Sequence, residues 1–539
     1  MARILQWWVA GAGLALLACT APQAVQAPSG GEVDAPKFGG VLNTVGQDFS
    51  DFDMVYQGRT VENVRDHGLV YDRLLAYKKG PGVEFVSQIL EPELAERWEV
   101  SSDARVFTYY LRPGVKFADV PPVNGRELAS ADVKWSMEYY SRTGEYKDKK
   151  LPISQIEALY EGLDAIETPD RSTVRVRFKE PFAPFLNYSA SQWMPIAARE
   201  TFKADESPPR IATLVGTGPY IIDTKNSLKD NRLVFTKHPT YWGGPKPYLD
   251  SIRRLIIPDE STRKAAFQTK QIDILASSGQ YQSAQEIKQN NPEAIKQQAL
   301  NPGHRNLFIS QLRPGPTQDI RVRRAISLAM DRDEYNKVWS EGNGTWALTG
   351  SFPGLFTDAE AHEMLKYDPE QAKRLLAEAG YASGLKLEFL PPAAVDPSEE
   401  LIQAQLKRVG IDVFFTIAPR EQNRARLYAG EFDLRLVGGG STGDGDFDSY
   451  QFAYHSASPQ NWSQIRDPEL DKLVVAQRRE ADPQKRRETQ RAVVRRINDM
   501  AWNPGYIFAP TVVFSHPYVK NFGPHWTVGE QEATVWLDK

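Results

Sequence analysis

The segment of the chain richest in reactive groups is a glycine-rich acidic loop at residues 438–450. It follows a predicted strand, Phe432 to Val437, and carries three carboxylates on flexible backbone, Asp444, Asp446 and Asp448. A cation enclosed by protein needs such a carboxylate to offset the loss of its hydration. The loop is therefore a candidate site for a cationic group, and a solvated acidic turn is the alternative.

The same loop has part of a calcium-site pattern. Asp444, Asp446 and Asp448 have the one, three, five spacing of an EF-hand, but Ser449 stands where that turn needs glycine. His455 stands where a bidentate glutamate is required. The pattern disfavours calcium.

The loop also has part of a hydrolase pattern. Residues 439–443 match the G-x-S-x-G nucleophile elbow and follow a predicted strand, which keeps a secreted serine hydrolase using Ser441 as an alternative. An elbow is followed at once by a helix, whereas residues 444–448 are acidic and turn-like. Elsewhere, His362-Glu363 has Lys366 where a zinc protease needs histidine, and nucleotide-binding fingerprints are absent. We therefore expect no enzyme, no cofactor and no metal site.

Two tryptophans lie in polar, glycine- or serine-bearing contexts. Trp193 ends the stretch 187–193 and Trp346 ends the stretch 342–346. Such rings suit a cleft, where they stack on sugars or pack against peptide side chains, although core packing is an equal alternative.

Composition narrows the function classes. The 539 residues include 65 Lys and Arg against 69 Asp and Glu, a net charge of -4, so the basic footprint of a nucleic-acid binder is absent. A single cysteine excludes an intramolecular disulfide. The length corresponds to about three or four domain-sized units.

The N-terminus looks like an export signal. Residues 1–18 have one positive charge and then an apolar run too short to span a membrane. Leu16 to Cys19 resembles the bacterial lipobox, in which the cysteine is lipidated; a secretory signal with a chance cysteine is the alternative. Residues 19–36 have the composition of a flexible tether, and the globular body begins near Lys37.

Strand and helix signals alternate along the body, which predicts an α/β or α+β architecture. The predicted strands are 41–45, 106–111, 173–178, 252–257, 411–417 and 432–437. Helices are predicted after Asp368-Pro369, Asp467-Pro468 and Asp482-Pro483, where an acidic N-cap precedes proline. Another apolar stripe runs from Val322 to Met330, and we expect its arginines, Arg321, Arg323, Arg324 and Arg332, largely to face away from the core.

Several segments, in order, resemble the extracytoplasmic solute-binding proteins of ABC importers, in the dipeptide, oligopeptide and nickel class called family 5. The similarity spans roughly residues 40–520. The segments are Leu90 to Trp98, Leu111 to Phe117, Ala131 to Val133, Gly216 to Tyr220, Tyr241 to Asp250, Asp319 to Arg332, Asp368 to Gly380 and Asp467 to Leu473.

The resemblance implies a two-lobed clamp with two chain crossings. Lobe I would comprise residues 37–301, with a subdomain near 86–190, and lobe II residues 302–509. Residues 510–539 would return to lobe I. Breaks at Asn301-Pro302-Gly303 and Pro504-Gly505 suit the crossings.

The resemblance also implies function: a non-enzymatic, monomeric protein that delivers a small solute to an ABC permease. We expect it in the periplasm or on the outer face of the cytoplasmic membrane, held by a lipid on Cys19.

Peptide is the leading ligand, because in relatives an aspartate of the corresponding loop pairs with the peptide ammonium. Asp444 is the first candidate and Asp446 the alternative, since the loop is one residue shorter and has Phe447 where relatives have proline. Gly440, Trp193, Trp346 and Gln47 are further candidate contacts; oligosaccharide is the alternative ligand. Seven scattered histidines give nickel no support.

Overall fold

The computed structural model describes residues 35–46, 61–84, 87–149, 156–203, 214–278, 281–300, 303–392, 394–440, 449–458, 460–525 and 530–539. Residues Pro36 to Lys539 form one compact unit. Cys19 and the predicted signal lie outside the described residues. Within the described ranges, none of the helices combines the length and hydrophobicity needed to cross a membrane.

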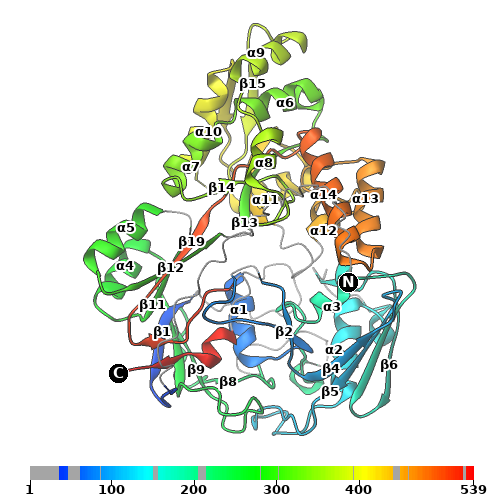
Figure 1. Ribbon diagram of the computed structural model, residues 1–539, viewed down its shortest axis with the longest axis vertical. Helices are drawn as coiled ribbons and strands as arrows, with labels where there is room; N and C mark the ends of the chain where they lie inside the picture. The colour runs from blue at the N-terminus through cyan, green and yellow to red at the C-terminus, as the bar shows by residue number, and fades with distance from the viewer. Residues whose placement is uncertain are drawn as a thin grey trace, which may run out of the picture. The chain divides into compact units, whose positions relative to one another are not determined.

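A seven-stranded mixed sheet draws its strands from both ends of the chain (Figure 1). In spatial order they are β12 (Ile295–Leu300), β19 (Pro510–Ser515), β11 (Ile274–Ser278), β1 (Val41–Gly46), β10 (Ser251–Ile256), β9 (Arg232–Lys237) and β8 (Tyr220–Ile222). Alternating apolar residues such as Leu42, Ile252 and Phe235 bury one face in the same core as the end of α1 (Val61–Val70). On the other face, Phe267 of α4 (Glu260–Gln268) packs with Phe514 beside α5 (Tyr281–Asn290).

A four-stranded antiparallel sheet shares this first core. Its strands are β4 (Ala95–Val100), β5 (Val106–Leu111), β7 (Thr173–Phe178) and β6 (Leu163–Asp170), and α2 (Ser130–Ser141) packs on β6. The first core therefore extends from the large sheet into this second sheet through residues such as Phe107 and Phe178. Three short elements complete this part: β2 (Leu75–Tyr77), its partner β3 (Leu90–Pro92) and α3 (Phe185–Tyr188).

A second core is built on another four-stranded sheet. Its strands are β13 (Gly303–Ile309), β17 (Leu434–Gly440), β15 (Leu385–Phe389) and β16 (Ile411–Phe415). The helices of this half are α6 (Ile320–Ala329), α7 (Arg332–Ser340), α8 (Asp358–Met364), α9 (Pro369–Glu378), α10 (Pro397–Lys407), α11 (Arg420–Ala429), α12 (Ser449–Tyr454), α13 (Pro468–Arg479) and α14 (Pro483–Asp499). Leu307, Leu387 and Leu436 of the sheet pack with Ile326 and Val494 of the helices.

The predicted helix starts are confirmed in atomic detail. The carboxylates of Asp368, Asp467 and Asp482 each accept hydrogen bonds from backbone N–H groups of the first turn, with proline next. Asp396, which the sequence analysis overlooked, caps α10 in the same way before Pro397.

The expectation for two arginines near α6 is wrong. Arg323 is 3% exposed and donates to the backbone oxygens of Thr317 and Gln318, while Arg332 is fully buried. Arg332 donates to the carbonyl oxygens of Gly505 (2.8 Å) and Leu365 (2.9 Å). Backbone carbonyls at chain turns therefore draw these guanidinium groups inward, because such carbonyls need donors when buried.

The chain passes between the two cores twice, and the two crossings run side by side. On the side of the seven-stranded sheet, Leu300 pairs with Pro510. On the side of the second core, Asn306 forms a bridge with Gly505, and β14 (Thr345–Trp346) pairs with β18 (Ile507–Phe508). At the C-terminus, β20 (Val519–Lys520) pairs with β21 (Trp536–Leu537).

Candidate functional site

The acidic loop leaves its sheet beside the first crossing. Gly440, the last residue of β17, pairs with Gly303, the first residue of β13. The next helix, α12, begins at Ser449. Ser441, Asp444 and Asp446 lie outside the described residues, but the strand that leads to them ends at Gly440, opposite Gly303 at the first crossing.

A second candidate loop follows β1, the middle strand of the large sheet. β1 ends at Gly46, opposite Ile256 of β10, and Gln47 then lies outside the described residues. A Cβ at Gly46 would come 2.7 Å from Cβ of Arg254, so the close approach of β10 requires glycine here.

Buried charges tie this loop's strand to its surroundings. The guanidinium of Arg254 is 1% exposed and lies 2.9 Å from the Asp66 carboxylate and 3.0 Å from that of Glu532. It also donates to the hydroxyl of Thr44 in β1, at 2.6 Å. One cation thus joins α1, β1, β10 and the C-terminal segment.

A charged cluster that sequence reasoning missed stands at the start of β13. Arg305 lies opposite Gly438 of β17, and its guanidinium is 2.7 Å from the carboxylate of Asp396 and 4.4 Å from the ring centre of Trp339. Arg305 is about one-third exposed. The signal was present in the sequence, because Arg305 lies two residues after the Asn301-Pro302-Gly303 break, immediately past the predicted crossing.

The pKa values of this cluster are shifted in opposite directions. Burial raises the pKa of Glu399 to about 7, and the neighbouring Asp396 carboxylate adds to that rise. For Asp396, burial opposes ionisation, but hydrogen bonds from Ser398 and Arg305 outweigh it and lower its pKa. At neutral pH the cluster therefore holds one firm ion pair and one carboxyl group near its midpoint.

The two candidate tryptophans have different surroundings. Trp193 is half-buried, packs against the first core, and follows Ser191, whose hydroxyl accepts its backbone N–H at 3.2 Å. Trp346 is 8% exposed, donates its indole N–H to Asp333 at 2.8 Å, and stacks on His362 with ring centres 3.9 Å apart. The Trp346 ring thus has a complete set of structural contacts within the second core.

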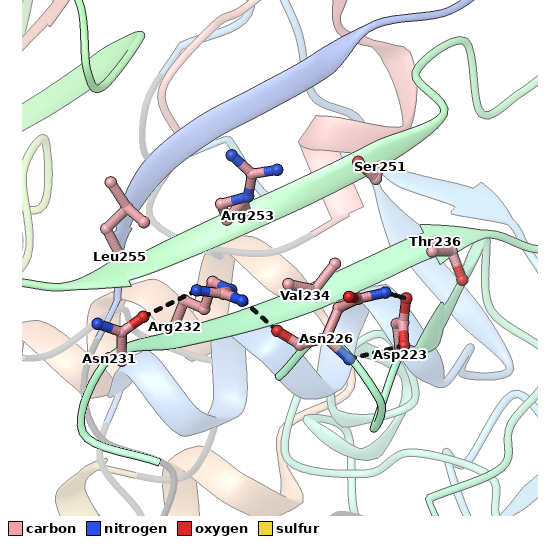
Figure 2. Close-up of a pocket in the computed structure, with 9 residues that line it drawn as sticks. All are labelled: Asp223, Asn226, Asn231, Arg232, Val234, Thr236, Ser251, Arg253 and Leu255. Atoms are coloured by element: carbon pink, nitrogen blue, oxygen red, sulfur yellow. Dashed lines mark hydrogen bonds between the residues drawn. The ribbon is translucent and has the colours of Figure 1, made fainter. Parts of the chain in front are cut away.

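A polar pocket of about 530 Å³ is lined by residues of β9, of β10 and of the turn between β8 and β9 (Figure 2). Its two arginines bond neutral oxygens: Arg232 donates to Asn226 and Asn231, and Arg253 to Asn43. Of the candidate ligand residues within the described ranges, Gly440, Trp193 and Trp346, none lines this pocket. The described ranges also contain no group of three or more His, Cys, Asp or Glu side chains placed to hold a metal ion.

Comparison with known proteins gives consistent relatives. Heme-binding protein A of Haemophilus influenzae is 28% identical over 75% of this chain and 75% of its own length. The dipeptide-binding protein of Escherichia coli K12 is 27% identical over 83% of this chain and 84% of its own length.

Among solved structures, an ABC transporter-associated periplasmic binding protein from Helicobacter pylori, in complex with the peptide STSA, is 26% identical. It matches with a TM-score of 0.77 over 93% of this chain and 99% of its own. The α/β two-lobed clamp expected from the sequence is therefore confirmed as the fold.

The family profile described as "Bacterial extracellular solute-binding proteins, family 5 Middle" matches residues 90–464, well over half of the chain. Together with the two cores and their paired crossings, this match identifies the chain as a member of family 5 of the bacterial extracellular solute-binding proteins.

Proposed function

We propose that this protein captures a peptide outside the cytoplasmic membrane and delivers it to an ABC permease. The observation that carries the proposal is the position of the acidic loop, which starts at Gly440 opposite Gly303, where the chain crosses between the cores. A relative named for dipeptide binding and another solved with a bound peptide support peptide as the ligand class.

In the proposed site, the carboxylate of Asp444 pairs with the α-ammonium group of the peptide, with Asp446 as the alternative partner. Gly440 and Gln47 supply contacts from the ends of β17 and β1. Trp193, which is half-buried, ranks ahead of Trp346 as an aromatic contact, because the Trp346 indole N–H is already bonded within the second core.

The proposed lobes follow the two cores. Lobe I comprises residues 37–301 with a subdomain near 86–190, lobe II residues 302–509, and residues 510–539 return to lobe I. Ligand closes the lobes only by its differential affinity for the closed form. The protein acts as a monomer without enzymatic activity, and a lipid on Cys19 holds it at the membrane surface.

The test is calorimetry with short peptides on the chain lacking residues 1–36. Asp444→Asn keeps the shape of the side chain but leaves the enclosed ammonium without its counter-ion, which costs about 3 to 5 kcal/mol, or roughly 100- to 5000-fold in affinity. N-acetylated peptide should bind the wild type poorly for the same reason.

The matched variant Asp446→Asn distinguishes the two carboxylates. If both variants keep peptide affinity within about threefold, which is under about 1 kcal/mol, the loop is a solvated turn and the assignment is wrong. An oligosaccharide ligand would reverse the pattern, with Trp193→Ala costing more than Asp444→Asn. Mass spectrometry of ligand that copurifies with the soluble chain identifies the class independently.

A further inference from the structure

One arginine of the second core reaches across to the first. The backbone N–H of Ala183 donates to the carbonyl oxygen of Arg478 in α13, at 3.0 Å. The guanidinium of Arg478 lies 2.6 Å from the carboxylate of Glu161 and 4.5 Å from the ring centre of Phe182. Three different interactions thus meet at a single side chain and its backbone.

These partners belong to separate cores. Phe182 packs with Phe178 and Phe185 in the first core. Leu470 and Val474, on the same helix as Arg478, are buried in the second core. The contact is therefore a bridge between the two halves of the clamp.

The bridge lies away from the two crossings. The crossings contact each other through β12 with β19 and through Asn306 with Gly505. Figure 1 draws α13 well to one side of β12 and β19, the strands that lead into the crossings. A rotation about the crossings that separates the cores must consequently pull Arg478 away from Phe182 and Glu161.

Burial shows which interaction dominates. Arg478 is 6% exposed and Phe182 4%, whereas the Glu161 side chain is 57% exposed. A cation desolvated against an aromatic face interacts more strongly than an exposed ion pair, which water and salt screen. Arg479, the next residue along α13, is exposed and provides a matched cation outside the bridge.

We infer that Arg478, with Phe182 and Glu161, is a latch that stabilises the closed clamp and so sets ligand affinity without touching ligand. The affinity part of this inference rests on the proposed function. Apparent affinity falls in proportion to the population of the binding-competent form, so a weaker latch raises the dissociation constant. Opening of the clamp to release ligand must break the latch, so its loss should accelerate ligand dissociation more than it slows association.

The chain offers a clean way to measure the latch directly. The chain's single cysteine is Cys19, so the soluble chain lacking residues 1–36 contains none. Spin labels on Arg171→Cys, beside the first core, and Lys472→Cys, on α13, report the separation of the halves, because these side chains are 68% and 77% exposed. Distance distributions are measured without ligand for the wild type, Arg478→Met, Glu161→Gln and the control Arg479→Met.

Arg478→Met should move the distribution to longer distances and weaken binding of the peptide STSA about tenfold, which corresponds to about 1.4 kcal/mol. Glu161→Gln, an exposed change that leaves packing intact, should weaken binding about two- to threefold in the same direction. Arg479→Met should match the wild type in both measurements.

Unchanged distances in both Arg478→Met and Glu161→Gln, with circular dichroism showing folded protein, would overturn the latch. A shift as large in Arg479→Met would also overturn it, since general loss of charge on α13 would then be the cause. If the wild type binds no peptide at all, the proposed function fails, and the distance distributions alone decide the latch.

Discussion

Raising the pH from 5 to 8 should destabilise this protein through one buried carboxyl group, Glu399. Its side chain is 1% exposed, and it accepts the backbone N–H of Asp396 at 3.1 Å, as the reciprocal half of the capping box of α10. Burial raises its pKa from the ordinary value of 4.5 to about 7. Between these two values the folded chain holds a proton that the unfolded chain has released, so stability falls as the pH rises.

The magnitude follows from the two pKa values. A difference of about 2.5 pKa units means that ionisation of Glu399 lowers the free energy of unfolding by at most about 3.4 kcal/mol. This limit is reached once the pH exceeds both pKa values. At pH 5 the unfolded chain is already partly ionised, so the change in this contribution between pH 5 and pH 8 is about 2.5 kcal/mol. This is a large share of the stability of an ordinary domain.

The assay is urea unfolding of the wild type and Glu399→Gln at pH 5 and pH 8. Glutamine keeps an oxygen that accepts the Asp396 N–H but cannot ionise. From pH 5 to pH 8 the free energy of unfolding of the variant should therefore rise by about 2.5 kcal/mol relative to that of the wild type. Glu400→Gln, an exposed neighbour in the same helix, is the control and should show no such gain. A relative gain in the free energy of unfolding below about 1 kcal/mol, or a change of opposite sign, refutes the reasoning. Such a gain would mean that folding shifts the pKa of Glu399 by less than one unit.

Three further predictions follow from the same structure and sequence. Arg254→Met strands the buried carboxylates of Asp66 and Glu532 and should cost about 3 to 5 kcal/mol, measured as a lower urea midpoint; an unchanged midpoint contradicts this. Cys19→Ser should leave an uncleaved or soluble product in membrane fractionation, and normal processing with membrane retention counts against a lipid anchor. Small-angle scattering should show a smaller radius of gyration with saturating peptide than without, and identical curves argue against a closing clamp.

Local signals in the sequence predicted much of the fold. The strands 106–111 and 173–178 are found with those bounds, because β-branched and aromatic residues alternate there and turns flank them. The helices after Asp368, Asp467 and Asp482 begin where predicted, since an acidic cap and a proline fix a helix start within a few residues. The strand predicted at 432–437 is found at Leu434–Gly440, so its glycines extend the ladder to the crossing.

Long-range contacts escaped prediction. Arg323 and Arg332 look like members of a solvated helix face, and their burial depends on carbonyl groups from Met500 and Gly505, which lie far away in the sequence. The role of Arg478 is equally invisible, because its partners precede it by some three hundred residues. Of the candidate site, the sequence could indicate the acidic loop, but its position beside Gly303 follows only from the pairing of β13 with β17.

The place of β19 inside the seven-stranded sheet constrains the order in which the protein can fold. Residues 510–515 lie between β12 and β11, and both of these strands come more than two hundred residues earlier in the sequence. Until the end of the chain is available to fold, β11 and β12 lack the strand between them and expose open edges of the kind that invite aggregation. The sheet of the second core, residues 303–440, is complete in sequence well before that. The half that begins first is thus the half that finishes last, and a chain cut short by its final thirty residues would lose the first lobe and keep the second.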